Sequence, residues 1–134
     1  MKVRVIVPAS AGNTGSAFDS LGLAYGLHNE VVAETDRPVV LFETGLPPRY
    51  YIPPEDVRGE ALVESEETTQ CPYKGVASYY SVEAGGGRED DLVWYYPEPL
   101  PEVSKIGGRL CFFNEKVDLQ VDGEAQERPR TQWS

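Results

Sequence analysis

The chain has little cysteine and histidine, and this shortage argues against a common class of metal-binding protein. Two cysteines, Cys71 and Cys111, and one histidine, His28, lie far apart in the sequence. They do not form the closely spaced pairs that common zinc sites require. The sequence therefore predicts no metal site, and no motif in it predicts a cofactor.

Positive charge and long apolar runs are also scarce. Lys and Arg number 12 against 22 Asp and Glu, which gives a net charge of −10. Such a surface repels nucleic-acid phosphate and anionic lipid, so we expect neither partner. No apolar run approaches the roughly 20 residues of a membrane helix, and "MKVRVIVPAS" does not have the form of a signal peptide. A cytoplasmic location with free thiols is the expectation.

Short apolar runs between prolines and glycines indicate strands. A length of 134 residues suits one domain. Val117, Leu119 and Val121 alternate with polar residues, as in a half-buried antiparallel strand, and Asp122-Gly123 favours a hairpin turn after it. Residues 84–90, "AGGGRED", predict a long flexible turn. The pattern predicts a mainly β, single compact antiparallel domain, with strands at 3–7, 30–34, 38–43, 60–65, 76–84, 91–96, 109–114 and 116–121.

Five stretches after residue 30 resemble one known family. They read "RPVVLFETGLPPRYYIPPEDV", "CPYKGVASYY", "WYYPEPLPEV", "GRLCFFNEKVDLQVDGE" and "RPRTQWS". In this order they resemble the family called domain of unknown function 427, which also carries a nucleotidyltransferase-like label. The resemblance implies a tent-like (Mss4-like) β fold without that group's zinc cysteines, and it implies no established reaction.

Residues 3–34 resemble a different family, the N-terminus of homoserine kinase in the GHMP small-molecule kinase superfamily. By resemblance, Asn13 and Asp19 would contact substrate. That superfamily's glycine-rich phosphate loop is missing here, and the chain is less than half as long as such a kinase. We therefore expect no homoserine kinase activity. The matching residues are Pro8, Ala9, Ser10, Asn13, Gly15, Phe18, Asp19, Ser20, Leu21, Gly22, Leu23 and Ala24.

The junction of the two resemblances suggests how the chain is organised. Residues 1–29 would form an N-terminal strand and loop, and residues 30–134 the β domain. The strand predicted at 30–34 suits both families, so the N-terminal piece would be a strand-loop-strand extension that pairs with the domain.

The first candidate for chemistry is "TQCPYKG" at 69–75. Lys74 follows Cys71 by three residues, and a nearby ammonium favours the nucleophilic thiolate. Cys71 and Lys74 are therefore weak catalytic candidates. The alternative is a small buried thiol at a turn, with Lys74 in a structural ion pair. Cys111 is predicted to be core.

The second candidate is "ETGLPPRYY" at 43–51. Two prolines would stiffen the loop before Arg49, whose guanidinium can grip a carboxylate or phosphate. An ion pair with Glu43 is the alternative. Together with aromatic residues, these side chains predict a pocket for a small anionic or planar molecule. Its predicted ligand-binding residues are Glu43, Arg49, Tyr50, Lys74, Trp94 and Tyr95.

Three functions are compatible with these features. The first is a small-molecule-binding β domain. The second is a nucleotidyl- or other group-transfer enzyme that uses Lys74, Arg49 and a carboxylate. The third is a structural or interaction module that forms a homodimer through exposed strand edges.

Overall fold

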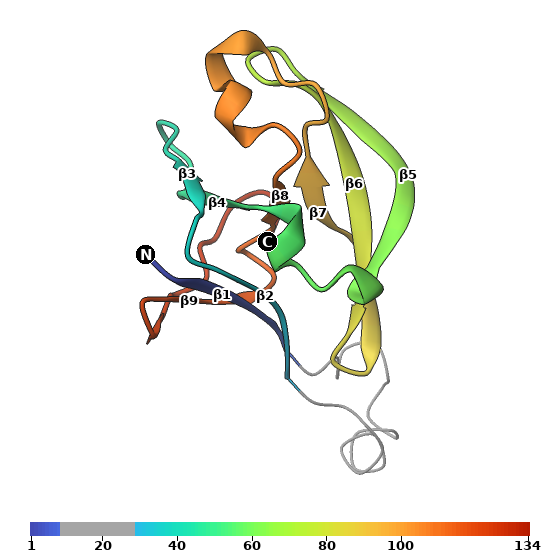
Figure 1. The fold of residues 1–134 in the computed structure, drawn as a ribbon, viewed down its shortest axis with the longest axis vertical. Helices are drawn as coiled ribbons and strands as arrows, with labels where there is room; N and C mark the ends of the chain where they lie inside the picture. Colours follow the sequence, from blue (N-terminus) through green and yellow to red (C-terminus); the bar gives the residue numbers. More distant parts are fainter. Residues whose placement is uncertain (9–28) are drawn as a thin grey trace.

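The protein is mainly β with antiparallel strands, as the sequence predicts (Figure 1). The computed structural model describes residues 1–8 and 29–134. Within these described ranges, the short 3-10 helices are η3 (Pro54–Asp56), η4 (Gly59–Ala61) and η5 (Pro101–Ile106). The strands are β1 (Val3–Val7), β2 (Glu30–Thr35), β3 (Val39–Leu41), β4 (Arg49–Ile52), β5 (Leu62–Cys71), β6 (Gly75–Ala84), β7 (Gly87–Tyr95), β8 (Leu110–Phe112), β9 (Asp118–Val121) and β10 (Glu124–Ala125).

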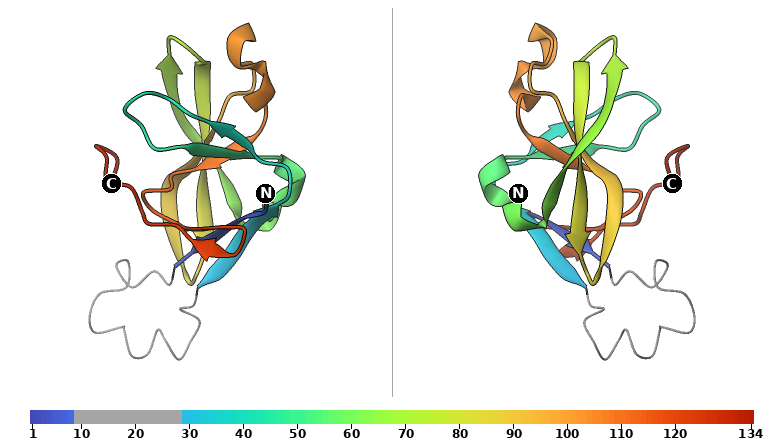
Figure 2. Two further views of the ribbon diagram at one scale, coloured as in Figure 1. Left: turned by 90° about the vertical axis from the view of Figure 1, so that its left-hand side faces the viewer. Right: turned by 90° about the vertical axis from the view of Figure 1, so that its right-hand side faces the viewer.

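The strands form two open sheets. The smaller has the order β10-β9-β1-β2, and the larger has the order β3-β4-β8-β7-β6-β5. Strands of the smaller sheet run across those of the larger one in all three views (Figures 1 and 2). The turn predicted at Asp122-Gly123 joins β9 to β10, and both residues have the positive φ of a tight hairpin.

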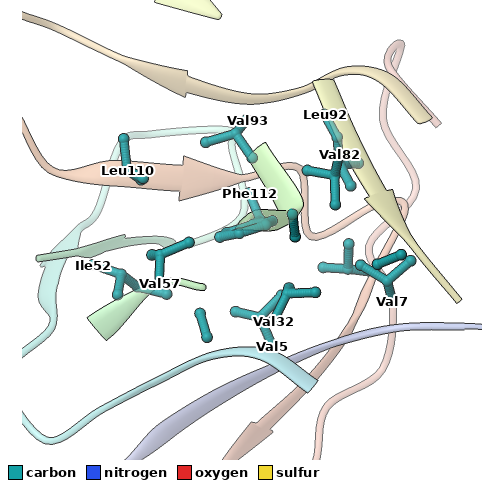
Figure 3. Close-up of a cluster of buried hydrophobic side chains, with 14 of the residues drawn as sticks. Val5, Val7, Val32, Ile52, Val57, Val82, Leu92, Val93, Leu110 and Phe112 are labelled. Carbon is teal, nitrogen blue, oxygen red and sulfur yellow. The ribbon is translucent and has the colours of Figure 1, made fainter. Parts of the chain in front are cut away.

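Aliphatic side chains from both sheets fill the space between them (Figure 3). Val3, Val5 and Val7 alternate inward from β1 and are at most 3% exposed. They meet larger apolar residues of the other sheet, among them Leu92 and Phe112. Burying each side chain of this size stabilises the fold by roughly 1.5–3 kcal/mol. This aliphatic layer is the main core.

The opposite face of the six-stranded sheet is aromatic. Trp94 lies between Tyr79 of β6 and Cys111 of β8, and Cys111 in turn pairs with Tyr51 of β4. Directly paired residues share a face, while their neighbours along each strand point to the other side. The same strands therefore supply an aliphatic inner face and an aromatic outer face, and the outer face carries the candidate site.

Two features differ from the sequence-based expectations. The long flexible turn predicted at 84–90 is a short turn at Gly85 and Gly86, because β7 already begins at Gly87. Strand β5 runs past the predicted end at residue 65 to Cys71, so Glu66 and Glu67 lie within it. Strand pairing in a sheet overrides the low β propensity of glycine and acids at these positions.

The N-terminal strand shares a sheet with the segment that begins at residue 30. β1 lies between β2 and β9, with Val5 opposite both Ala33 and Leu119. Its residues are therefore part of the main core. Most of the kinase-like segment, including Asn13, Asp19 and His28, lies outside the described residues.

Candidate functional site

A pocket of about 490 Å³ opens on the aromatic face of the six-stranded sheet. Its volume lies within the range of small-molecule sites. Figure 2 shows two segments that contribute to its rim, the loop of residues 42–48 and the C-terminal segment, on the same side of the molecule. The lining residues are Glu43, Leu46, Arg49, Tyr51, Thr69, Gln70, Cys71, Pro72, Tyr73, Lys74, Tyr79, Trp94, Tyr96, Phe113 and Trp133.

The structure brings together most of the residues singled out from the sequence. Glu43, Arg49, Cys71, Lys74 and Trp94 all line this pocket, although they come from segments up to 51 positions apart. The loop after β3 supplies Glu43, and the turn between β5 and β6 supplies Lys74.

Tyr50 and Tyr95 do not join them. Tyr50 borders a smaller hollow of about 220 Å³ beside Pro47 and Pro48. Tyr95 stacks on Tyr80, with ring centroids 4.9 Å apart, against the aliphatic core. Each follows a pocket residue directly along its strand, so the alternation of side chains places it on the opposite face.

Arg49 is held in a buried network rather than by Glu43. Its Nη1 and Nη2 donate to the two carboxylate oxygens of Glu115 at 2.6 and 2.9 Å, and Nη1 also donates to Asn114. The Thr131 hydroxyl donates to Glu115 at 2.6 Å, so the C-terminal segment is attached to the same carboxylate. Two parallel bonds of this kind fix the guanidinium plane.

The electrostatics of this pair follow from burial and from its hydrogen bonds. Burial alone raises the pKa of Glu115, but the bonds from Arg49 and Thr131 outweigh it and hold that pKa below its ordinary value. Burial likewise lowers the pKa of Arg49, and Glu115 more than restores it. Both groups are therefore charged at neutral pH, and each compensates the other.

Lys74 is compensated in the same way at the other end of the pocket. Its Nζ lies 2.8 Å from Glu43 Oε2 and 3.7 Å from Cys71 Sγ. The side chain is 11% exposed, and that of Glu43 is 29% exposed. Of the two alternatives for Lys74, the structural ion pair is present, and the thiol lies next to it.

Aromatic rings form the floor and enclose the Arg49 guanidinium. Trp94 Nε1 donates to the Tyr51 hydroxyl at 3.1 Å, and the Phe113 ring lies 4.5 Å from Trp94. The carbon at the centre of the Arg49 guanidinium lies 5.1 Å from the Trp94 ring centre and 5.9 Å from that of Trp133. Both distances allow a cation–π contact. Burial raises the pKa of Tyr51, so its hydroxyl stays neutral.

A comparison with protein-family models shows which family the chain belongs to. The family model described as domain of unknown function (DUF427) matches residues 23–123, which is more than half of the chain. The chain belongs to the DUF427 family. The match confirms the resemblance seen in the sequence, and it begins earlier than residue 30. No curated protein matches the chain significantly.

Within residues 1–8 and 29–134, no three His, Cys, Asp or Glu side chains gather closely enough to hold a metal ion. The described part of the chain also has no helix that is both long and apolar enough to cross a bilayer.

The tightest turn beside the DUF427 pocket depends on Gly75. Its φ is +116°, and an added Cβ would lie 3.2 Å from the Glu98 carbonyl oxygen. The neighbouring Lys74 carbonyl accepts a bond from Leu100 N–H at 2.8 Å, which ties the β5–β6 turn to the segment before η5. These two segments lie side by side in Figure 1. The turn that presents Cys71 and Lys74 is therefore fixed on both sides.

We expect Gly75→Ala to reduce the free energy of unfolding by about 1–3 kcal/mol, because a side chain is strained at this φ and crowds a carbonyl. Urea unfolding followed by circular dichroism measures the change. Gly59→Ala is the matched control, since nothing lies within 4 Å of its added Cβ, and it should change stability by no more than about 0.5 kcal/mol. Equal losses in the two variants would contradict the assignment.

Several lining residues were not predicted from the sequence. Three of them are tyrosines that belong to tyrosine-rich runs: Tyr51, Tyr79 and Tyr96. Alternate positions of a strand face opposite sides of the sheet, so the register decides which tyrosine of each run faces the pocket. Their neighbours Tyr50, Tyr80 and Tyr95 face the other side. Glu115 follows a strand in "FFNEK" with no motif to mark it as the partner of Arg49.

Proposed function

We propose that this DUF427 domain binds a small planar molecule in the aromatic pocket. The observation that supports it is the pocket floor, where Tyr51 of β4, Trp94 of β7 and Tyr79 of β6 lie on the same face of one sheet. Rings fixed by strand pairing can stack on a flat ligand at low entropic cost.

The charges of the pocket favour planarity over negative charge in the ligand. Arg49 is paired with Glu115, and Lys74 is paired with Glu43. Each cation is compensated by a carboxylate, so the two pairs add no net positive charge to attract an anion. A ligand with a flat ring and one or two polar groups fits this balance better than a multiply charged one.

The group-transfer alternative would use Lys74, Arg49 and a carboxylate. A nucleoside triphosphate carries several negative charges. Two cations that are already paired with carboxylates neutralise those charges poorly. Binding of a triphosphate in preference to its base would favour this alternative.

The homodimer alternative is opposed by charge at one sheet edge. β5 is the edge strand of the six-stranded sheet and carries Glu64, Glu66 and Glu67, all exposed. Like charges on an edge strand discourage a second copy from pairing with it.

Calorimetric titration of the full chain with adenine, indole and 4-hydroxybenzoate tests the proposal, with cyclohexanecarboxylate as the non-planar comparison. We expect at least one planar probe to bind about 10-fold more tightly than the non-planar one, because ring stacking contributes about 0.5–1.5 kcal/mol. Equal affinities, or no binding by any planar probe, would overturn it.

A matched pair of variants separates the two faces of the sheet. Tyr79→Ala removes a ring from the pocket, and Tyr80→Ala removes its neighbour on the core side. We expect only Tyr79→Ala to weaken binding of the planar probe. Equal weakening by both variants would place the ligand elsewhere.

A further inference from the structure

Cys71 is the thiol that faces the pocket. It ends β5 half-buried, and the Lys74 ammonium lies 3.7 Å from its sulfur. An ammonium at that distance stabilises the charge of a thiolate, which is the nucleophilic form. Glu43 fixes the ammonium in place through the 2.8 Å contact with Nζ.

Cys111 provides an internal contrast. It lies on β8, with β7 and β6 between it and β5, on the same sheet face but is 0% exposed. Burial raises its pKa well above the ordinary value, which favours the unreactive thiol. The chain therefore carries one accessible and one inaccessible thiol.

Tyr96 supplies a second, independent observation on the same wall. The residue is only 6% exposed, yet its hydroxyl makes no hydrogen bond to any other described residue. Across residues 1–8 and 29–134, every fully buried side-chain nitrogen or oxygen has a partner. The Tyr96 hydroxyl is therefore not fully buried, and because Tyr96 lines the pocket we infer that the hydroxyl faces it.

Cys71 and Tyr79 pack against the buried cluster that contains Tyr96, so the thiol and the Tyr96 ring lie in the same part of the pocket. Burial raises the pKa of Tyr96, and Cys71, Tyr79 and Glu43 add to the shift through their charges. The hydroxyl is thus protonated at neutral pH and lies within electrostatic range of Cys71. A phenolic hydroxyl that faces the pocket can donate a hydrogen bond to a ligand oxygen in place of water.

We propose that Cys71 forms a covalent adduct with a planar conjugated enone bound in the pocket. The proposal rests on the proposed function, because it uses the same pocket and the same planar ligand. An enone has three properties that fit this side of the pocket. Its flat body can stack on the aromatic rings, its carbonyl oxygen can accept a hydrogen bond from Tyr96, and the sulfur can attack its soft electrophilic carbon.

The reaction needs no further reactant. The Cys71 thiolate forms a carbon–sulfur bond at the β-carbon, and the carbon–carbon π pair moves toward the carbonyl to give an enolate. Tyr96 donates a hydrogen bond to the enolate oxygen, and Lys74 stabilises the thiolate before the attack. The proton lost from the thiol to solvent is balanced by one taken from solvent at the α-carbon, so the product is a thioether ketone.

The test is to incubate the full chain at pH 7 with benzalacetone, a planar enone, and to locate adducts by intact-mass and peptide mass spectrometry. We expect one adduct, at Cys71, forming about 10-fold faster than on N-acetylcysteine, because the pocket orients the reactants and a charged hydrogen bond stabilises the enolate. Cys111 should react only in urea. A Cys71 rate equal to that of N-acetylcysteine would overturn the proposal.

Variants show whether Tyr96 acts on the enolate or only on the fold. Tyr96→Phe should slow the enone reaction about 10-fold, the value of one hydrogen bond to a charged oxygen, and leave alkylation by iodoacetamide unchanged, since that reaction forms no enolate. Tyr80→Phe, on the other face, should change neither rate. Equal slowing of both reagents by Tyr96→Phe would overturn the assignment.

Lys74→Met should slow both reagents, because it removes the charge beside the sulfur, and Lys74→Arg should restore part of each rate. No slowing by Lys74→Met would overturn its role.

Failure of this proposal differs from failure of pocket binding. If indole or adenine binds but benzalacetone leaves Cys71 free, the adduct is wrong and the binding function stands.

Discussion

Glu115→Ala is expected to reduce the free energy of unfolding by about 3–5 kcal/mol, which is the usual cost of leaving a buried charge without its partner. The Arg49 side chain is 5% exposed and that of Glu115 is 0% exposed, so water cannot replace the missing carboxylate. The Thr131 hydroxyl loses its acceptor as well. Urea unfolding at pH 7, followed by circular dichroism, measures the loss.

A surface ion pair provides the matched control. Arg4 and Glu34 lie 2.7 Å apart, with side chains 41% and 39% exposed. Glu34→Ala should therefore cost no more than about 1 kcal/mol, because exposed pairs contribute little. Similar losses for Glu115→Ala and Glu34→Ala would show that the Arg49 network does not stabilise the fold.

The pH dependence of stability gives an independent readout of the same pair. The folded-state pKa of Glu115 lies below its ordinary value of 4.5, so its contribution is present above pH 4.5 and is lost as pH falls through the folded value. Glu115→Gln should remove this part of the acid sensitivity. An unchanged pH profile in that variant would contradict the assignment.

Val5→Asp is expected to have an effect of similar size, about 3–5 kcal/mol, because it places an unpaired carboxylate in the main core. That is a large share of the 5–15 kcal/mol by which a domain is usually stable. Val5 is 0% exposed and belongs to β1, which is hydrogen-bonded on both sides. Thermal unfolding by circular dichroism, together with urea unfolding, measures the change.

The neighbouring residue serves as the control for that substitution. Arg4 points away from the core and is paired only at the surface, so Arg4→Gln should cost no more than about 1 kcal/mol. If Val5→Asp were as stable as Arg4→Gln, residues 3–7 would be dispensable for the β domain. A large loss would support a fold in which the kinase-like N-terminus supplies an essential strand.

Strand alternation and turn chemistry made much of the fold predictable. β1 and β9 alternate apolar and polar residues, and Asp122-Gly123 marks the hairpin between β9 and β10. β4 was missed because Pro47 and Pro48 precede it, and the stretch read as a stiff loop. The start of β7 was missed because glycine and acids have low β propensity, which pairing with β6 overrides.

Most residues of the candidate site could be predicted from the sequence, but the sheet face on which each tyrosine lies could not. Glu43, Arg49, Lys74 and Trp94 meet in one pocket, whereas Tyr50 and Tyr95 point to the other face. Moving one position along a strand reverses the face, and runs such as "RYY" and "WYY" do not show which member points outward. The pairing of Arg49 with Glu115 joins residues 66 positions apart, which no local pattern indicates.

The placement of the two tryptophans gives the pocket its own optical reporter. The chain has only Trp94 and Trp133, and both line the pocket, with ring centres 5.1 and 5.9 Å from the central carbon of the Arg49 guanidinium. Intrinsic tryptophan fluorescence therefore originates entirely beside the ligand space, while the aliphatic core between the sheets contributes none of it. A flat molecule that enters the pocket should change the emission without any added dye, and changes confined to the far side of the molecule should leave it unaltered.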